Sequence, residues 1–477
     1  MRPDMGERAL PRIGTLLVCM LAGAFAASAT DAQAPVGWTA SVDREVAPGV
    51  RYLELERGEV ADAPRWDVVV ASSSKQSAAD GWVWRVLAAG FEPTVLYGSG
   101  RYEIRVIGLA DRASAERTRT RLSELGAPEP PKIVESAQDI ANPGGPWVAH
   151  LLVADPGAVE VRALHARDAT FGQETTTSIA RRHGALAAIN GGFYLPEDDL
   201  AGDSAGTLVV AGRLLSEPDR GRGTVGFYRE EGRVRTIFGR PTWSAIATLA
   251  SGDQIAIDGI DRRRRRDEAI VYTPEFHRRT LTEPGGVEAT VVGGRIVAVR
   301  DGLGGSEIPA DGFVLSVGPA RSGEDGIELR VGESVSIESG LASRRDDPGE
   351  AWSRAESAVS AGPLLLAGGE PVGRPELEAI SQVFSRARHP RTAVGVRADG
   401  TLLLLAVEGR RPERSVGMSL EELTALLEAL GAVDAVNLDG GGSTAMVVRD
   451  ELVTTPSDAR GERENGDALL LFPAPEP

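Results

Sequence analysis

The chain of 477 residues is long enough for two or three domains. Its composition, 42% hydrophobic and 25% charged, is a globular balance that excludes a wholly disordered chain. The net charge of -17 argues against nonspecific nucleic-acid binding, because attraction to phosphates requires a basic surface. A single cysteine excludes a disulfide framework, a CxxC zinc site and an iron–sulfur cluster.

Residues 1–29 have the pattern of a secretory signal peptide. A basic start precedes the apolar stretch Ile13–Ala27, and Ala27-Ser28-Ala29 supplies the small residues that a signal peptidase recognises. The stretch is short for a membrane span, and an uncleaved anchor is the alternative. No later run of about 18 apolar residues occurs. We therefore expect a mature chain without a membrane span, in the periplasm or outside the cell.

Two copies of one pattern follow between residues 60 and 136. When Arg65 is aligned with Arg101, each copy has a strand, a helix with small residues on one face, a Gly stop and a run containing Pro. Gly90 falls on Gly126 at the ends of the two predicted helices. Two such units predict one compact domain with the element order βαββαβ.

The second copy, YEIRVIGLADRASAERTRTRLSELG, resembles a SPOR domain, in which a strand leads through G-x-A-D-R-A-x-A-E into a helix. SPOR domains are bacterial envelope modules, and the resemblance implies that residues 60–136 bind the glycan strands of peptidoglycan. A spacer domain without a ligand is the alternative, because a fold alone does not determine function. The Pro- and Gly-rich residues 137–147 are expected to form a linker.

A large domain is predicted over residues 148–473, and its first polar loop follows a short apolar strand. Ala185–Ile189 is the strand, and Asn190-Gly191-Gly192 comes directly after it. The loop is either an Asn-Gly hairpin turn or part of a ligand site at the end of a strand. The alternating runs between residues 207 and 337 are typical of hairpins, and we expect one antiparallel sheet beside a cleft. Arg262–Arg266 is predicted to be a solvated loop.

The C-terminal half has the clearest pattern. The continuous apolar run Leu402–Val407 is typical of a strand buried on both faces. Ser419 and Glu422 form the capping box of a leucine-striped helix, and Val433–Leu438 is the next strand. A strand, a capped helix and a strand predict a crossover between parallel strands.

Three successive glycines occur in the loop Asp439–Ser443 (DGGGS), directly after that strand. Because glycine loses much conformational entropy on folding, such a run requires a reason. The backbone N–H groups can face an anion, or a ligand can press against the main chain. A turn in which Asp439 caps its own backbone is the alternative. Asn437 and Asp439 alternate along the chain, so both side chains can point to one side.

The motifs AAINGGFY, SAGPLLL, HPRTAVGV and VNLDGGGSTAMVV, in this order, resemble the phosphodiester glycosidase family. The resemblance extends from about Trp147 to the C-terminus and includes PSDARGER. It implies an α+β or α/β domain with a mixed sheet that hydrolyses a sugar C1–O–phosphate linkage. The family's motif positions in this chain are Asn190, Gly191, Gly192, Arg391, Thr392, Asn437, Asp439, Gly440, Gly441, Gly442 and Ser443.

Such a reaction requires a carboxylate beside an oxocarbenium-like centre and donors for the departing phosphate. We assign the carboxylate to Asp439, with Glu408 as its acid/base partner. Arg391 and the amides of Gly440–Gly442 are the predicted phosphate clamp, and an Arg391 that only holds the fold is the alternative. The other predicted substrate-binding residues are Asn190, Gly191, Gly192, Thr392, Asn437 and Ser443, of which the two asparagines either bind sugar hydroxyls or orient the carboxylates.

The chain departs from the family pattern at two places. Glu408 stands where the resemblance leads us to expect Asp, and Glu464-Asn465-Gly466-Asp467 replaces the usual apolar run before the final strand. The histidines have no metal-ligand spacing, and two carboxylates alone do not specify a divalent cation. No cofactor is predicted.

Three functions fit this sequence. The leading one is an exported hydrolase that cleaves a sugar-1-phosphodiester in an envelope or extracellular glycan and binds peptidoglycan through its SPOR-like domain. The second is a glycosidase that acts on a glycan without phosphate. The third is a catalytically inactive envelope protein that binds glycan. A phosphate requirement separates the first two, and dependence on Asp439 separates both from the third.

Overall fold

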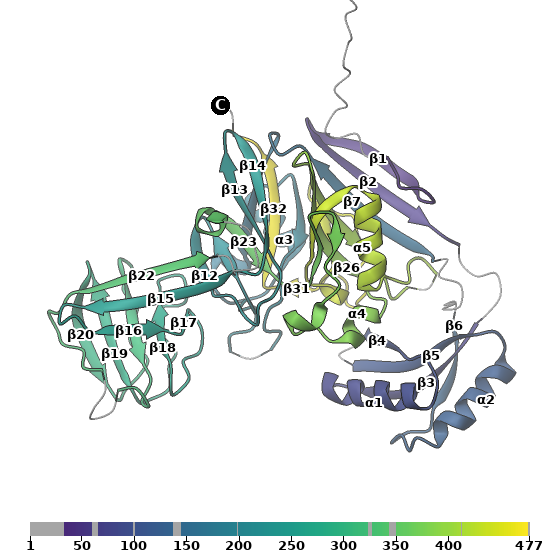
Figure 1. Cartoon of the computed structure of the whole chain (residues 1–477), viewed down its shortest axis with the longest axis horizontal. Helices are drawn as coiled ribbons and strands as arrows, with labels where there is room; N and C mark the ends of the chain where they lie inside the picture. The colour runs from purple at the N-terminus through teal and green to yellow at the C-terminus, as the bar shows by residue number, and fades with distance from the viewer. Residues whose placement is uncertain are drawn as a thin grey trace, which may run out of the picture.

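The computed structural model describes residues 33–59, 65–98, 101–136, 145–197, 199–322, 327–342, 350–411 and 413–475. The predicted signal peptide and most of the predicted linker lie outside these ranges. The described chain is mostly β-sheet and comprises a main domain, a small domain of residues 65–136 and a β-rich lobe of residues 242–342 (Figure 1). Within the described ranges, none of the helices is long and apolar enough to cross a membrane.

The largest sheet of the main domain has the strand order β1-β2-β7-β27-β26-β28-β24-β25. Its strands are β1 (Thr39–Ala47), β2 (Val50–Arg57), β7 (Trp147–Ala154), β24 (Leu364–Ala367), β25 (Glu370–Pro371), β26 (Arg391–Arg397), β27 (Leu402–Val407) and β28 (Ala432–Asn437). Every neighbouring pair is antiparallel. The predicted crossover between parallel strands is present, because β27 and β28 run in the same direction, but the two strands do not pair: β26 lies between them and is antiparallel to both.

The large sheet is buried on both faces. Alternate residues of β27 contribute to two cores, one shared with the other sheets of the main domain and one beneath α5 (Leu420–Ala429). This double burial explains the continuous apolar run at Leu402–Val407. The helix begins with the predicted capping box, in which the Ser419 hydroxyl accepts a hydrogen bond from the Glu422 amide.

Two smaller sheets cover one face of the large sheet. Their strand orders are β30-β29-β10-β32-β8 and β12-β11-β23-β13-β14. The strands are β8 (Val159–His165), β10 (Ala187–Asn190), β11 (Leu208–Val210), β12 (Arg213–Ser216), β13 (Thr224–Glu230), β14 (Arg233–Gly239), β23 (Ser357–Ser360), β29 (Met446–Val448), β30 (Glu451–Leu452) and β32 (Asp467–Pro473). Helix α3 (Thr176–His183) packs on β10 and β32, and the short strands β9 (Glu174–Thr175) and β31 (Glu464–Asn465) pair beside it.

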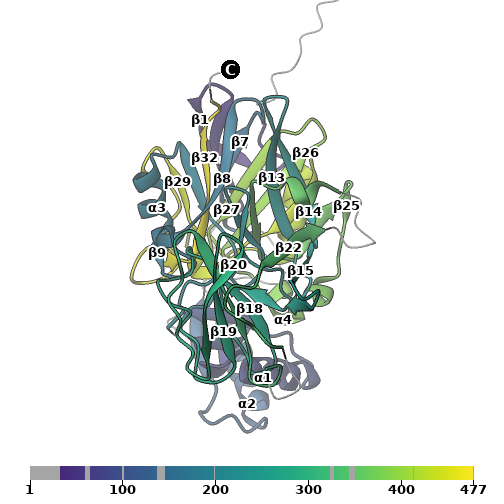
Figure 2. The same cartoon turned by 90° about the vertical axis from the view of Figure 1, so that its left-hand side faces the viewer.

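The small domain has one four-stranded sheet in the order β4-β5-β3-β6. Its elements are β3 (Arg65–Ser73), α1 (Gln76–Ala88), β4 (Thr94–Gly98), β5 (Arg101–Leu109), α2 (Arg112–Ser123) and β6 (Lys132–Ser136). Both helices lie on one face of the sheet, on the side away from the main domain (Figures 1 and 2). Asp111 caps α2 by accepting a hydrogen bond from the Ser114 amide at 2.6 Å.

The small domain is inserted into the main domain. Strand β2 precedes the small domain in the chain, yet it pairs along its whole length with β7, the first strand after the small domain. The main domain therefore includes the hairpin β1–β2, and the predicted start at residue 148 omits both strands. An edge hairpin carries no local signal of the sheet that it joins, because its partner strand lies about ninety residues away.

The β-rich lobe has its own hydrophobic core. Its two sheets have the orders β16-β15-β22 and β17-β18-β21-β19-β20. The strands are β15 (Thr242–Leu249), β16 (Gln254–Ile257), β17 (Gly259–Ile260), β18 (Ala269–Tyr272), β19 (Val287–Val292), β20 (Arg295–Asp301), β21 (Gly312–Val317) and β22 (Val335–Ala342). The prediction of one sheet from the middle strands is wrong, because they divide between this lobe and the main domain. Arg262 links the lobe to the main domain through ion pairs with Glu217 and Glu268. The run Arg262–Arg266 is therefore not wholly solvated, as the sequence had predicted it to be.

The placement of the hairpin can be tested at Leu55 of β2, which is fully buried in the core beneath α5. We expect Leu55→Ala to lower the free energy of unfolding by about 2–5 kcal/mol, because it leaves a cavity in a packed core. Urea unfolding followed by tryptophan fluorescence measures the change. Val36→Ala, at a fully exposed position, is the control. Equal stability of the two variants would show that the hairpin is not part of the folded domain.

Candidate active site

Two polar loops meet where β10 and β28 end. The Asp439 amide donates a hydrogen bond to the Gly191 carbonyl at 3.1 Å, and Asn190 Nδ2 donates to the Asp439 carbonyl at 2.8 Å. Asn190 Oδ1 accepts from the Thr392 hydroxyl at 2.7 Å and from the Ala445 amide at 3.1 Å. The polar atoms of the Asn190 side chain are thus used within the protein. This geometry suits an orienting role better than contact with sugar hydroxyls.

Asp439 is a half-buried residue at this junction. Burial raises its pKa to about 6 and the charge of Asp467 acts in the same direction, while Ser443, the Gly440 amide and Arg463 act against them. The Gly440 amide donates to Asp439 Oδ1 at 2.9 Å. A carboxyl group that lies in a polar loop and titrates near neutral pH has the properties of a reacting group.

The glycines after Asp439 make room for two arginines. A Cβ atom at Gly441 would lie 2.7 Å from Nη2 of Arg410. A Cβ atom at Gly442 would overlap the guanidinium of Arg463. Any larger residue at either position would push an arginine away from the loop, which is a physical reason for the glycine run.

The structure differs from the predicted clamp of glycine amides. The Gly440 amide donates to Asp439, and the Gly441 amide donates to the Pro390 carbonyl at 2.9 Å. These two amides therefore already donate hydrogen bonds to protein oxygens and do not point at an anion site. Cationic donors near the loop come instead from arginine side chains that the sequence motifs did not indicate.

Arg463 lies between two carboxylates. Its Nε donates to Asp458 Oδ2 at 2.8 Å, and its charge also acts on Asp439. Burial opposes the charged form of Arg463, but Asp458 raises its pKa overall. The side chain remains about one-third exposed, at 32%, so it can still meet a ligand. Tyr194 lies beside this group, and burial together with the charge of Asp439 raises its pKa to about 12.

Arg222 is a third cation near Asp439. Its guanidinium lies 4.9 Å from the ring centroid of Phe193, the residue that follows the Asn-Gly-Gly loop. Burial lowers its pKa, and the carboxylates of Asp219 and Asp439 act in the opposite direction. Its Nε is buried and has no hydrogen-bond partner among the described residues. A buried donor without a partner is costly unless a ligand or water accepts from it.

Arg391 is not placed as a phosphate clamp. Its guanidinium is fully buried, where Nε donates to the Met418 carbonyl at 2.9 Å and Nη2 donates to the Phe384 and Ala387 carbonyls at 2.8 Å. Burial, together with the charge of Arg410, lowers its pKa to about 9. Arg391 therefore holds the end of α4 (Gln382–Arg386). This agrees with the alternative in which Arg391 only holds the fold. It does so through hydrogen bonds to carbonyl groups rather than through an ion pair.

Glu408 is not placed as an acid/base group. Its side chain is sealed from solvent and accepts hydrogen bonds from Arg414 Nε at 2.6 Å, the Thr455 amide at 2.8 Å and His150 Nε2 at 2.9 Å. Burial opposes ionisation, but these partners lower its pKa to about 2. A carboxylate that stays ionised and has no access to solvent cannot deliver a proton to substrate. Glu408 instead holds the segment around Thr455, close in sequence to Asp458.

Asp467 is a second buried carboxyl group, and it explains the Asn-Gly-Gly loop. Its Oδ1 accepts from the Gly192 amide at 2.6 Å, and its Oδ2 accepts from the Ser204 hydroxyl at 2.8 Å. A Cβ atom at Gly191 would overlap this carboxyl group. Burial raises the pKa of Asp467. The sequence signal for this carboxyl group was the departure from the family pattern at Glu464-Asn465-Gly466-Asp467, which places an Asp at the start of an apolar strand.

The remaining predicted residues lie beneath the loops. Asn437 is fully buried, and its Nδ2 donates to the Leu438 carbonyl at 2.7 Å and the Gly362 carbonyl at 2.8 Å. Its Oδ1 is buried without a partner among the described residues. Ser443 is also buried, with its hydroxyl close enough to Asp439 to lower the carboxyl pKa. Asn437 thus holds the backbone just before Asp439, and Ser443 acts on the carboxyl group itself.

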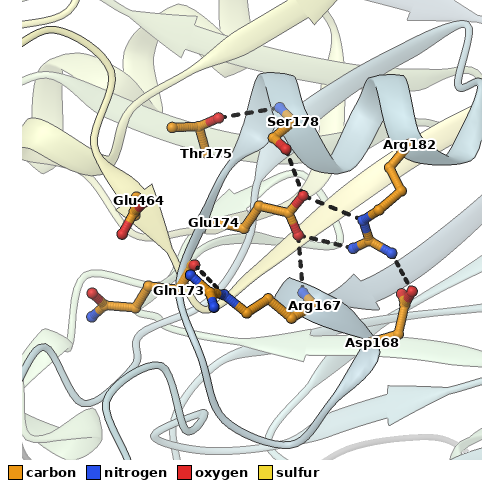
Figure 3. A pocket seen from close by; sticks show the side chains of 8 residues that line it. All are labelled: Arg167, Asp168, Gln173, Glu174, Thr175, Ser178, Arg182 and Glu464. Atoms are coloured by element: carbon orange, nitrogen blue, oxygen red, sulfur yellow. Dashed lines mark hydrogen bonds and ion pairs between the residues drawn. The ribbon is translucent and has the colours of Figure 1, made fainter.

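A separate polar hollow of about 580 Å³ lies beside β9 and β31 (Figure 3). Its charged groups pair with one another: Glu174 accepts from the Ser178 hydroxyl at 2.6 Å and from Arg182, which also pairs with Asp168. A ligand there would have to displace these pairs. Within the described ranges, no three His, Cys, Asp or Glu side chains are grouped so that they could hold a metal ion. We therefore place the candidate active site at Asp439.

Two family models match this chain. Residues 285–472 match the phosphodiester glycosidase model, and residues 62–130 match the SPOR domain model. Both resemblances drawn from the sequence motifs are thus confirmed. The glycosidase match includes Asp439 and its arginine neighbours Arg410 and Arg463.

The curated relatives match over short stretches. A prophage-derived uncharacterized protein of Bacillus subtilis (strain 168) is 39% identical over 84 residues, which are 18% of this chain and 13% of that protein. The N-acetylglucosamine-1-phosphodiester alpha-N-acetylglucosaminidase of Mus musculus is 39% identical over 75 residues, which are 16% of this chain and 14% of that enzyme. The similarity thus spans a small part of either relative.

Two solved structures are similar over most of the chain. A protein of Burkholderia pseudomallei K96243 that is named as exported has a TM-score of 0.70 and 27% identity, covering 92% of this chain and 98% of that chain. A hypothetical protein from Synechocystis has a TM-score of 0.59 and 21% identity, covering 92% of this chain and 81% of that chain. The second likeness shows the fold alone.

The ionised state of Glu408 can be tested through stability. We expect Glu408→Gln to lower the free energy of unfolding by about 3–5 kcal/mol at pH 7, because it breaks a buried charge pair. The folded-state pKa of about 2 lies below the ordinary value of 4.5. The charge therefore stabilises the fold above about pH 4.5, and this contribution is lost as the pH falls toward 2.

Urea unfolding at pH 7, 4.5 and 3 should show the gap between Glu408→Gln and the unaltered chain narrowing below pH 4.5. Glu328→Gln is the control, because it removes an exposed pair with Arg330 and should cost less than about 1 kcal/mol. A gap that stays constant with pH would contradict an ionised Glu408.

Proposed function

We propose that this chain is an exported hydrolase that cleaves the C1–O bond of a sugar-1-phosphodiester in an envelope or extracellular glycan. The match of residues 285–472 to the phosphodiester glycosidase model supports the reaction class. The SPOR match supports a peptidoglycan-binding module and an envelope location. The observation that carries the proposal is the carboxyl group of Asp439, whose pKa is about 6 and which interacts with Arg222 and Arg463 in a loop that Arg410 also approaches.

Asp439 is the proposed carboxylate that stabilises or attacks C1 as positive charge develops there. Water supplies the hydroxyl group that C1 gains, and the C1–O bond breaks with release of a phosphate monoester. Because a phosphate monoester leaves with little protonation, the reaction does not require a second carboxylic acid. The proposal therefore needs no acid/base role for Glu408.

Arg222, Arg410 and Arg463 replace Arg391 as the proposed phosphate ligands. Arg410 and Arg463 approach the loop at Gly441 and Gly442, and Arg222 has a buried Nε without a protein partner among the described residues. Charge-assisted hydrogen bonds from arginine are among the strongest that a phosphate can receive. They would stabilise the charge that the leaving phosphate gains.

We expect the mature chain to hydrolyse UDP-GlcNAc, a GlcNAc-1-phosphodiester, and Asp439→Asn to reduce kcat by roughly 1,000-fold, because the carboxylate that stabilises C1 is lost. The pKa of about 6 is raised above the ordinary value, so Asp439 is ionised above pH 6 and neutral below it. The value of kcat/KM should therefore fall about tenfold per pH unit below pH 6. Sugar release measured from pH 4 to 8 tests both expectations.

Near-normal turnover by a folded Asp439→Asn chain would overturn the assignment. Hydrolysis of p-nitrophenyl GlcNAc without hydrolysis of any sugar-1-phosphodiester would favour a glycosidase that acts on glycans lacking phosphate. No release from any of these compounds would favour an inactive glycan-binding protein.

Gly442→Ala tests the arginine site without removing a charge. The added methyl group overlaps Arg463, so we expect the guanidinium to move and KM for UDP-GlcNAc to rise at least about tenfold, the effect of losing one charge-assisted hydrogen bond. Gly340→Ala is the matched control, because a Cβ atom there meets nothing within 4 Å. An unchanged KM in Gly442→Ala would remove Arg463 from the phosphate site.

A further inference from the structure

The small domain is held in place at more than its chain connections. It is inserted between β2 and β7, so both of its ends join neighbouring strands of the main sheet. Its strand β4 also contacts α4, and Ala387, just after α4, packs into the small domain's own hydrophobic core. These three attachments distinguish it from a module on a single flexible linker.

Helix α4 also borders the candidate active site. The ring of Phe384 in α4 lies edge-on to Phe193, with centroids 6.4 Å apart. Phe193 follows the Asn-Gly-Gly loop and lies beneath Arg222, one of the proposed phosphate ligands. Arg391 holds two carbonyls at the end of α4. The small domain thus rests on a segment that forms part of the wall of the site.

The open face of the small domain's sheet is turned toward the main domain. Val68 and Val70 point into the core beneath the helices. Because successive side chains of a strand point to opposite faces, Val69 points away from the helices. Figures 1 and 2 show both helices on the far side of the sheet, so this second face looks toward the main domain.

A groove of about 590 Å³ lies on this open face. Val69 and Val134 are among its apolar lining residues. Its charged lining residues are Arg101, Glu103, Arg105, Glu129 and Lys132, of which Arg105 pairs with Glu103 and Lys132 pairs with Glu129. Apolar surface suits the faces of sugar rings, and cations suit the carboxylate or phosphate groups of an anionic glycan. The groove thus has the chemistry to hold a glycan strand on the side that faces the main domain.

We propose that the groove and the Asp439 site bind one molecule, a peptidoglycan strand that carries the scissile sugar-1-phosphodiester as a substituent. This inference rests on the proposed function and names its substrate class. Water adds to C1 of the substituent sugar, the C1–O bond breaks, and the phosphate stays on the strand as a monoester. The small domain then positions the substrate in addition to retaining the protein on the wall.

Competition with unmodified glycan strands separates this arrangement from simple tethering. We expect long strands, prepared from purified sacculi and stripped of peptides, to inhibit hydrolysis of UDP-GlcNAc competitively. At ten times their inhibition constant the apparent KM should rise about tenfold with kcat unchanged. A GlcNAc–MurNAc disaccharide, the short counterpart of the strand, is the control and should inhibit far less.

The double variant Arg101→Glu/Lys132→Glu should hydrolyse UDP-GlcNAc normally but lose inhibition by strands. Arg117→Glu, an exposed charge reversal on α2 at the opposite face, is the matched control and should keep the inhibition. Strands that bind the protein without inhibiting it, or that fail to bind, would overturn the inference. Failure of the unaltered chain to hydrolyse any sugar-1-phosphodiester, seen before a strand is added, would overturn the proposed function and this inference with it.

Discussion

The side-chain amide of Asn190 is the interaction on which the site depends. Strands β10 and β28 belong to different sheets, so no backbone ladder sets the distance between the loops that follow them. Asn190 supplies that link, because one buried amide donates to the Asp439 carbonyl and accepts from Thr392 and Ala445. A buried amide with its donor and acceptor atoms satisfied specifies one geometry and penalises others. The position of the Asp439 carboxyl group follows from this constraint.

Burial and positive charge act on Asp439 in opposite directions. Burial raises the carboxyl pKa, and Arg463 lowers it, so the group titrates near neutral pH instead of remaining neutral or fully ionised. Gly442 determines how strongly Arg463 acts on the Asp439 pKa, because a larger residue there would push the Arg463 guanidinium away from the loop. The entropic cost of the glycine run is thus balanced by an electrostatic arrangement that larger residues would not permit.

The sequence predicted what local pattern determines. The bounds of β27 and the capping box of α5 were correct, because burial on both faces and helix capping leave signals within a few residues. A ligand site was one of the two interpretations of each loop, at Asn190 and at Asp439, and the structure brings these loops together. The roles of Glu408 and Arg391 could not be predicted. Glu408 pairs with His150, which is 258 residues away, and Arg391 is held by backbone carbonyls that carry no side-chain signature.

The insertion of the small domain also escaped prediction because β2 and β7, the strands that flank it, pair across a long stretch of sequence. The insertion bears on how the small domain works. A domain on one linker samples many orientations, and it must lose them when a ligand engages both it and a distant site. A domain that is joined at β2 and β7 and packed on α4 loses most of that freedom during folding. A ligand that reaches both sites then binds without the orientational cost, so its effective concentration at the second site is high. For a short or freely diffusing substrate the insertion brings no such advantage.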